Sequence, residues 1–324
     1  MIEYYPVRLE KLDQEKWDSL VRNQGSAFHL TAWLKTWEQS FPFESSVYLA
    51  VDNGEIVGGM PFCIRKKFKF KEAYSMPRGC YGGALLNEGE DPDIRNSIES
   101  EFTYWCLREE FTRINIVEFS RQVNTNLDTY DIKPLSTHLL NLKYSSSEQL
   151  EKLASSHRRN LPKAVDKDFT TEIIQDRQGV KTYFNMLQET ARRQGRQPFY
   201  RLEFYNALLQ NFEDDDTLYW PIIYFEGRPV ASAIVFIHGN MAVYWDGASN
   251  EEALEKGANF YLFWNLIKML KEMNIELLNF GASPRKHPGL RRFKAGWGAE
   301  RMPYFEYNYQ KPISRLARKV KGFF

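Results

Sequence analysis

The order of secondary-structure elements expected in the first half of the chain is repeated in the second half. An extended run ending at Val51, a polar turn and a run from Ile56 to Ile64 return as Leu218 to Phe225, a turn and Val230 to Ile237. In both copies a long amphipathic stretch then leads into a short extended run, Ile114 to Phe119 or Ile275 to Phe280. Equivalent positions lie roughly 160 to 175 residues apart, which is too long for a solenoid repeat and predicts two related domains.

Each half is predicted to contain a strand, two helices, three strands, a helix and two final strands. Three consecutive strands with tight turns form an antiparallel meander, which excludes a doubly wound nucleotide fold and a barrel. We expect the third strand of the first meander at Tyr74 to Leu86 and a connector helix at Glu148 to Val165. The prediction is therefore an α+β protein with domains at residues 1–145 and 146–310, each a mixed, largely antiparallel sheet flanked by helices.

Composition narrows the class of function. The 324 residues carry a formal charge of +1 and are 43% apolar, which predicts two globular cores and no sequence-specific DNA binding. The three cysteines form no CxxC pattern and the five histidines have no ligand spacing, so we expect no metal and a reducing cytoplasm. Met1 to Leu9 lacks a continuous apolar run, which argues against a signal peptide or a membrane span at this end.

The order of elements resembles that of the GNAT acyltransferase fold. This resemblance implies that the pyrophosphate of an acyl donor binds at the start of the helix that follows the fourth strand. Free backbone N–H groups and the helix dipole attract anions at such a position. The corresponding residues are Lys256, Gly257 and Ala258, which we predict to bind the donor, with helix capping by Gly257 as the alternative.

Five phrases of the second half, in the same order and spacing, resemble the FemABX family. They are Leu153 to Ala164 (LASSHRRNLPKA), Glu189 to Gly195 (ETARRQG), Tyr244 to Ser249 (YWDGAS), Leu278 to Ser283 (LNFGAS) and Phe293 to Gly298 (FKAGWG). Members of this bacterial family and its relatives transfer an acyl group, often an aminoacyl group from charged tRNA, to an amine. The best known build the interpeptide bridges of peptidoglycan in cell wall biogenesis, and an acetyltransferase-like branch uses acyl thioesters. The chain lacks the long coiled-coil insertion of some tRNA-using members.

Three residues of these phrases are candidates for catalysis. Acyl transfer to an amine needs a base for the amine proton and a cation or donor for the carbonyl oxygen. Lys294 is the expected cation, Asp246 the expected base, and Tyr244 the expected proton donor to the leaving group. The alternative is that Lys294 is a solvated charge, Asp246 a turn cap and Tyr244 a core residue.

Further polar residues of the second half are candidates for substrate binding. Arginine binds phosphate through a planar fork of donors, and irregular loops after strands often carry sites. Cations also favour the carboxyl end of a helix for stability alone, which is the alternative for the Arg192 and Arg193 pair. The predicted substrate-binding residues are Arg158, Arg159, Asn160, Arg192, Arg193, Ser283, Arg285, His287 and Phe293.

The last residues form a basic amphipathic tail, 311–324. Cations recur without any acid, and apolar residues recur at helical spacing, as expected of a helix that contacts anionic lipid headgroups. A short helix packed on the body is the alternative. The sequence therefore predicts a cytoplasmic protein with peripheral contact at the inner face of the membrane.

Taken together, the resemblance and the residues predict an N-acyltransferase with two tandem GNAT-like domains. We expect it to transfer an acyl or aminoacyl group to an amine of a cell-envelope precursor, a muropeptide or an amino sugar. The donor, aminoacyl-tRNA or acyl-CoA, is expected as a co-substrate, and no cofactor is expected to be tightly bound. The alternatives are an acyl-CoA-dependent N-acetyltransferase acting on an amino sugar or amino-acid metabolite, and a catalytically silent protein that binds an anionic lipid-linked or nucleotide-linked ligand.

Overall fold

The structure is a computed structural model that describes residues 1–68, 70–77, 79–120, 122–124, 127, 129–213 and 216–311. The chain forms two compact units. The first comprises Met1–Leu135 and the chain from Pro303 onward, and the second comprises Ser136–Met302. The units are therefore not the two halves of the sequence, because the last strand of the chain lies in the first unit.

The sheet of the first unit is mixed and largely antiparallel. Its strand order is β1-β2-β3-β4-β6-β14, with β5 paired to β3. Only the pair of β4 and β6 is parallel among the pairings described for this unit. The strands are β1 (Glu3–Arg8), β2 (Phe43–Asp52), β3 (Glu55–Lys67), β4 (Phe70–Tyr74), β5 (Leu85–Leu86), β6 (Arg113–Glu118) and β14 (Glu300–Gln310).

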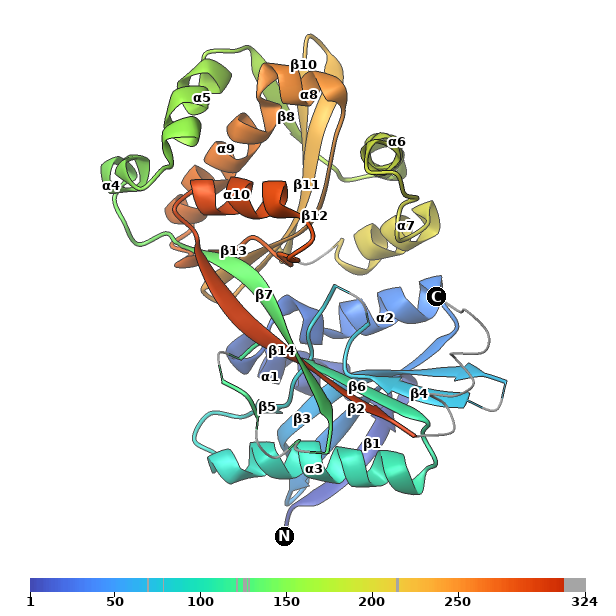
Figure 1. Cartoon of the computed structure of the whole chain (residues 1–324). Helices are drawn as coiled ribbons and strands as arrows, with labels where there is room; N and C mark the ends of the chain where they lie inside the picture. The colour runs from blue at the N-terminus through green and yellow to red at the C-terminus, as the bar shows by residue number, and fades with distance from the viewer. Residues whose placement is uncertain are drawn as a thin grey trace. The chain divides into compact units, whose positions relative to one another are not determined.

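Helices cover both faces of this sheet (Figure 1). A Cβ at Gly58 would meet Ile98 of α3, whereas a Cβ at Gly59 would meet Trp17 of α1. Successive residues of a strand point to opposite faces, so α3 and α1 pack on opposite sides of β3. The helices are η1 (Leu9–Lys11), α1 (Gln14–Gln24), η2 (Ala27–His29), α2 (Thr31–Ser40) and α3 (Pro92–Arg108).

The strand predicted at Tyr74 to Leu86 is wrong. β4 ends at Tyr74, and the chain is irregular until the short β5. This segment contains Pro77 and Gly79, Gly82 and Gly83, which weaken or break a strand ladder. The apolar residues that suggested a strand, such as Met76 and Tyr81, are buried in the irregular segment instead.

The sheet of the second unit has the corresponding strand order. Its path is β8-β10-β11-β12-β13-β7, with β9 paired to β11, and only β12 and β13 are parallel among its described pairings. Since β7 follows β6 in the sequence and β14 follows β13, each unit takes its last strand from the other half of the sequence. The strands are β7 (Asp131–Asn141), β8 (Phe169–Ile173), β9 (Leu218–Tyr219), β10 (Pro221–Phe225), β11 (Arg228–His238), β12 (Met241–Ser249) and β13 (Leu277–Asn279).

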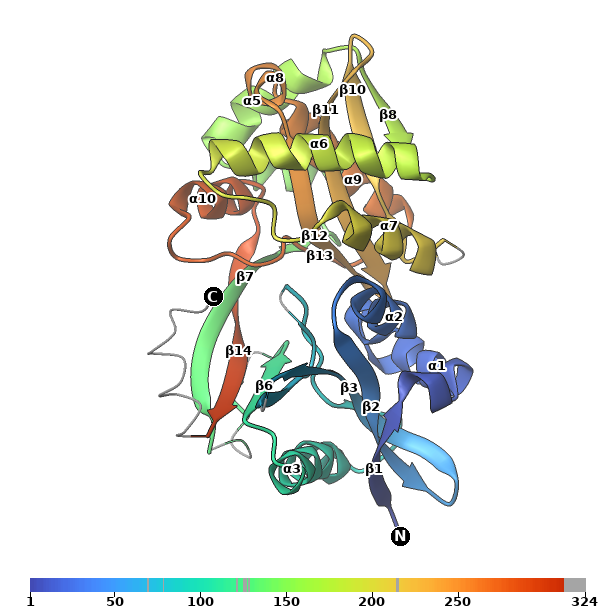
Figure 2. The same ribbon diagram turned by 90° about the vertical axis from the view of Figure 1, so that its right-hand side faces the viewer.

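In the second unit, α6 lies across one face of the sheet and α9 lies on the other (Figure 2). The predicted connector helix from Glu148 to Val165 is two helices, because the Ala154 N–H bonds the Gly296 carbonyl instead of a carbonyl one turn earlier. The helices are α4 (Ser146–Glu151), α5 (Ser155–Val165), α6 (Arg177–Arg193), α7 (Leu202–Asn211), α8 (Glu251–Lys256), α9 (Ala258–Glu272) and α10 (Pro288–Gly296). Both units confirm the predicted α+β class with helix-flanked, largely antiparallel sheets.

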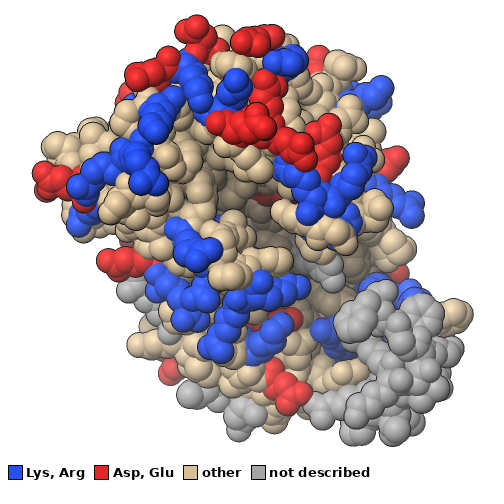
Figure 3. All heavy atoms as spheres, turned by 45° about the horizontal axis from the view of Figure 1, so that its top comes forward, with Lys and Arg blue, Asp and Glu red and all other residues tan. Residues whose placement is uncertain are grey.

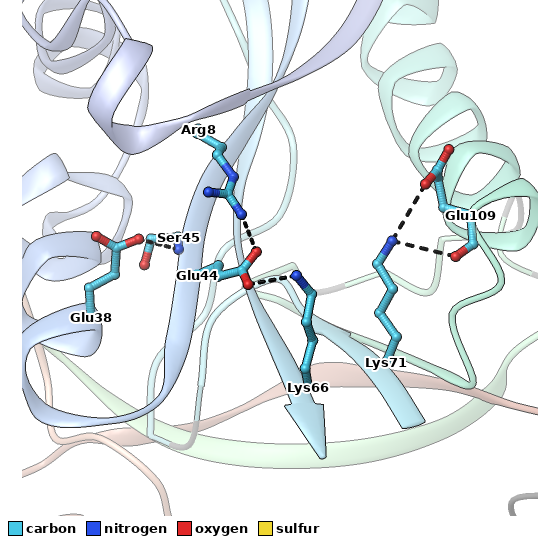
Figure 4. A network of polar contacts seen from close by, with 7 residues as sticks. All are labelled: Arg8, Glu38, Glu44, Ser45, Lys66, Lys71 and Glu109. Atoms are coloured by element: carbon cyan, nitrogen blue, oxygen red, sulfur yellow. Dashed lines mark hydrogen bonds and ion pairs between the residues drawn. The ribbon is translucent and has the colours of Figure 1, made fainter. Parts of the chain in front are cut away.

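Polar contacts brace the edge of the first unit (Figure 4). Glu44 pairs with Arg8 and, at 2.6 Å, with Lys66, and so joins strands β1, β2 and β3. Lys71 reaches Glu109 at 3.5 Å. These side chains are between 28% and 55% exposed, and such solvent-accessible pairs contribute about 0–1 kcal/mol each, so the network stabilises this edge only locally.

Candidate functional site

The second unit contains a point where two parallel strands part. β12 and β13 pair from Met241 with Leu277 to Val243 with Asn279. After Asn279 the chain leaves β12 but continues beside β7, since the Phe280 and Ser283 N–H groups bond the carbonyls of His138 and Ser136. Residues 244–249 of β12 and 280–283 after β13 are called the fork below. A bulge in β12 lies at the start of the fork, where Tyr244 and Asp246 pair with consecutive residues of β11.

Two glycines are required by close approaches within the fork. A Cβ on Gly281, whose φ is +68°, would lie 2.5 Å from the Tyr244 carbonyl oxygen. A Cβ on Gly247 would lie 2.1 Å from the Tyr244 hydroxyl. Both distances are too short for any larger residue without displacement, which gives a physical reason for glycine in YWDGAS and LNFGAS.

Lys294 of α10 is buried and directed at the fork. Its Nζ donates to the carbonyl oxygens of Gly281, at 3.0 Å, and Ala282, at 2.7 Å. The side chain is 2% exposed, and burial lowers the pKa of Lys294 to about 7. Near neutral pH this amine is therefore present in both protonation states, and it is not the solvated surface charge that the sequence left open.

Asp246 is held on the other arm of the fork. Its carboxylate accepts hydrogen bonds from the Tyr205 hydroxyl at 2.8 Å and from the Gly247 N–H at 2.9 Å. Burial raises the pKa of Asp246 in spite of these bonds. The Tyr244 ring packs on Phe263, and burial, followed by the Asp246 charge, raises the pKa of Tyr244 so that its hydroxyl stays protonated. Contacts thus link Lys294, Gly281, Tyr244, Gly247 and Asp246.

Of the predicted site residues that follow β13, some are buried in the core and others lie on the surface. Ser283 is buried, and its hydroxyl lies 2.9 Å from Nδ1 of His138. Phe293 packs in an aromatic cluster with His157, Phe263 and other rings. The predicted ligands Arg285 and His287 lie on the exposed loop before α10.

The two predicted basic clusters lie in different surroundings. Arg158 donates to the carbonyl oxygens of Glu151, at 2.6 Å, and Leu153, so it caps the end of α4. Its neighbours Arg159 and Asn160 have no described contact with the fork.

Arg193 reaches the fork from the end of α6. It donates to the Ser249 carbonyl oxygen, which places its guanidinium at the end of β12. Arg192 is exposed. Of the predicted basic residues of these two clusters, Arg193 is the one that the structure brings to the fork.

The start of α9 differs from the expected phosphate site. Gly257 adopts a left-handed conformation and its N–H bonds the Ala253 carbonyl, so it caps α8. Ala258 is fully buried, and a Cβ on Gly257 would lie 3.4 Å from Ala164 of α5. The carbonyl of Lys256 accepts a hydrogen bond from Lys167 at 2.5 Å. The Gly257 N–H is therefore already bonded within α8, and Ala258 is buried.

Two residues of this region, His138 and Tyr205, were not among the predicted site residues, whereas Arg196 belongs to the basic cluster predicted around Gly195. Tyr205 bonds Asp246, His138 bonds Ser283, and the positive charge of Arg196 lies close enough to lower the pKa of Asp246. The sequence signal for Arg196 is its place beside Arg192 and Arg193 at the end of α6, whereas no sequence pattern marked His138 or Tyr205. Within the described ranges no cluster of His, Cys, Asp and Glu is suited to a metal ion, and no helix is long and apolar enough to cross a membrane.

Comparisons with known proteins agree with this fold. Residues 152–301, most of the second unit, match the model of the acetyltransferase (GNAT) domain family. Lipid II:glycine glycyltransferase of Staphylococcus aureus is 27% identical over 105 residues, which are 30% of this chain and 25% of the relative. The chain thus aligns with about a quarter of the length of this curated relative.

Solved structures extend the likeness to the whole chain. The crystal structure of FemX has a TM-score of 0.77 at 15% identity, covering 99% of this chain and 100% of that one. L-PGS from Bacillus licheniformis has a TM-score of 0.62 at 14% identity, covering 95% and 94%. A tandem GNAT protein of the clavulanic acid biosynthesis pathway has a TM-score of 0.57 at 11% identity, covering 96% and 98%. The predicted resemblance to FemABX and GNAT proteins is confirmed in fold.

Proposed function

We propose that this chain, with its GNAT domain and the fold of FemX, is an N-acyltransferase that acylates an amine of a cell-envelope precursor. The observation that carries the proposal is the fork of the second unit, where a buried lysine with a pKa of about 7 meets the end of a parallel strand pair. A lysine that changes protonation near neutral pH suits the proton transfers of acyl transfer. The name of the Staphylococcus aureus relative, which specifies glycyl transfer and lipid II, supports an aminoacyl donor and a peptidoglycan precursor as acceptor.

Lys294 supplies the proton transfers in this proposal. The neutral amine uses its two N–H donors on the carbonyls of Gly281 and Ala282, which leaves the nitrogen lone pair to accept a proton. The acceptor amine attacks the donor carbonyl carbon, a C–N bond forms, and the carbonyl electron pair moves to oxygen. Lys294 takes the amine proton, and the resulting ammonium offsets the charge on that oxygen. The bond to the leaving group then breaks, and the ammonium returns the proton to the leaving atom.

Asp246 and Tyr244 shape the β12 arm in this account. The Asp246 carboxylate already accepts two hydrogen bonds, which fix the strand bulge beside the reacting groups. The Tyr244 hydroxyl remains protonated and is available as a donor to the leaving group. The predicted base, Asp246, therefore becomes a positioning residue in the proposal, and Lys294 becomes the base first and the cation second.

The start of α9 supports aminoacyl-tRNA as the donor in preference to acyl-CoA. A pyrophosphate at that position needs free backbone N–H groups. Here the Gly257 N–H is used within α8 and Ala258 is buried. An ester-linked aminoacyl group on RNA does not require this pyrophosphate position.

Basic side chains around α10 support an anionic donor as well. Lys and Arg gather into groups on the face drawn in Figure 3. The cations on α10 and on the chain just before and after it are called the α10 patch: Arg285, Lys286, Arg291, Arg292 and Arg301. Within the described part of the chain, these five side chains form no ion pair with an acid, so they are available for phosphate groups.

A donor panel tests the function. Purified protein is incubated with charged tRNA or with acyl-CoA, together with a muropeptide, amino-sugar or amino-acid acceptor, and acyl transfer to the amine is measured by mass spectrometry. Transfer from charged tRNA to the muropeptide supports the proposal, and transfer from acyl-CoA alone establishes the acetyltransferase alternative, which the GNAT family match favours. Thermal stabilisation by a donor without any transfer identifies a silent binding protein and contradicts the proposal.

We also propose that residues 311–324 contact anionic lipid, which would hold the enzyme near a lipid-linked acceptor. Apart from Lys311, these residues lie outside the described ranges, so the proposal depends on their basic and apolar sequence pattern. Flotation with vesicles of anionic lipid, with and without residues 312–324, tests it. Equal flotation of the two proteins would contradict it.

A further inference from the structure

Three consecutive buried side chains of β7 face the chain that follows β13. The Ser136 hydroxyl donates to the Ser283 carbonyl at 3.0 Å. The Thr137 hydroxyl lies 2.8 Å from the Gly281 carbonyl oxygen. Nδ1 of His138 lies 2.9 Å from the Ser283 hydroxyl. β7 thus binds both the backbone and a side chain of the fork arm that accepts Lys294.

His138 and Ser283 are connected to Lys294 through the Gly281 carbonyl. The Ser283 hydroxyl donates to the Gly281 carbonyl oxygen at 3.3 Å, and the same oxygen accepts the Lys294 Nζ at 3.0 Å. When Ser283 donates its single proton to this carbonyl, its oxygen accepts from Nδ1 of His138. His138 and Ser283 are 4% and 1% exposed, so this chain of contacts is shielded from water.

We propose that His138 and Ser283 are positioning residues that hold the Gly281 and Ala282 carbonyls against Lys294 and thereby keep its amine shielded from water. The inference rests on the proposed function, because the shielded amine is the base assigned there. It adds a pair of residues outside the catalytic machinery that sets the pH range in which the base works.

Among the described residues, the charged groups that act on His138 of β7 are all basic. They are Lys294 and Arg291 on α10 and Arg301 on β14. Burial, followed by the charges of Lys294, Arg291 and Arg301, lowers the pKa of His138, so the ring is neutral at neutral pH. Releasing the carbonyls admits water to the Lys294 amine, which favours its charged form and raises its pKa.

The test compares Ser283→Ala and His138→Gln with the unchanged protein. Lysine is labelled with ¹³C and ¹⁵N, and the side-chain signal of Lys294, assigned by its loss in Lys294→Met, is followed by NMR across pH 5 to 11. We expect a midpoint near 7 in the unchanged protein and a higher midpoint in both variants. Where transfer is measurable, kcat falls roughly 10-fold or more with KM little changed, and the pH profile moves in the same direction.

Thr182→Ala is the matched control, because this hydroxyl bonds only the Gln178 carbonyl of its own helix among its described contacts. Its midpoint should equal that of the unchanged protein. A midpoint that is unmoved in the folded His138→Gln and Ser283→Ala proteins would overturn the inference. Since the NMR titration needs no turnover, a protein without transferase activity would contradict the proposed function and still allow this test.

Discussion

The same strand junction is built differently in the two units. In the first unit β4 and β6 pair up to Tyr74 with Asn115, and the chain then continues the ladder itself. The Ser75 N–H bonds the Asn115 carbonyl at 2.7 Å, and the Gly82 N–H bonds the Val117 carbonyl at 2.9 Å. In the second unit no described ladder pair continues β12 and β13 beyond Asn279, and the fork remains between them.

The two junctions also bury opposite kinds of titratable group. The first unit has Glu99 of α3 close to Glu118 at the end of β6, whereas the second has Lys294 beside the chain after β13. Burial, followed by the Glu118 charge, raises the pKa of Glu99 to about 7. The first junction is thus filled by its own chain, whereas the second presents a buried amine. This difference is the reason why we propose the second unit as the place of the chemistry.

The largest expected effect follows from removing the amine of the second junction. Lys294→Met keeps the length and apolar stem of the side chain but removes the proton acceptor. We expect the single-turnover rate of transfer to fall by roughly 100- to 10,000-fold, with donor binding retained. Rapid-quench assays measure the rate, and calorimetry measures donor binding.

Lys71→Met is the control in the first unit, because Lys71 is a partly buried lysine on β4 that pairs with Glu109. Its rate should stay within about twofold of the unchanged protein, as expected for a surface pair of small energy. Equal losses in the two variants would end the assignment of chemistry to the second unit.

A smaller effect is expected from closing the fork with a methyl group. In Gly247→Ala the new Cβ would lie 2.1 Å from the Tyr244 hydroxyl, so the ring must leave its place on Phe263. We expect about a 10-fold loss of transfer rate and a fall in Tm of about 2–4 °C. Gly289→Ala is the control, because a Cβ there meets no atom within 4 Å, and its rate and Tm should not fall. A Gly247→Ala protein with full activity would show that Tyr244 need not be held in place.

The smallest effect on activity is expected from a substitution at the first junction, Glu99→Gln. The folded pKa of Glu99 lies above its ordinary value of 4.5, so folded protein holds a proton that unfolded chain releases between pH 4.5 and about 7. Stability from this group therefore falls as pH rises through that window. Glu99→Gln should leave transfer unchanged, match the unchanged protein at pH 4, and raise the unfolding free energy by about 3 kcal/mol at pH 8. Denaturant titrations at both pH values measure this, and equal stabilisation at pH 4 and pH 8 would refute it.

The fold was largely predictable because strand and helix periodicity repeats in both halves. The sequence did not predict that β7 joins the sheet of the second unit and β14 the sheet of the first. Each of these strands follows a short strand of similar pattern, and no local sequence feature selects the sheet that it joins. The segment after Tyr74 was misassigned because buried apolar residues such as Tyr81 look alike in strands and in packed loops. In both cases the structure depends on pairing between segments that are far apart in the sequence, which local patterns do not reveal.

The candidate site was predictable only in part. Lys294 and Gly281 lie in phrases with a visible pattern, and the structure brings them together. His138 was invisible because it lies on a strand about 145 residues before Ser283, and only the folded sheet makes them neighbours. Arg158 carried the right charge but caps a helix, which spacing alone does not reveal.

The pH dependence of the single-turnover transfer rate tests the central claim most directly. If neutral Lys294 accepts the amine proton, the rate rises with pH through a midpoint near 7 and then levels off, because the lowered pKa leaves the amine uncharged above that value. The residual rate of Lys294→Met should lack this rise. A wild-type rate that falls as pH increases through 7 would contradict the account, because it would require the charged form of Lys294 at the start of the reaction.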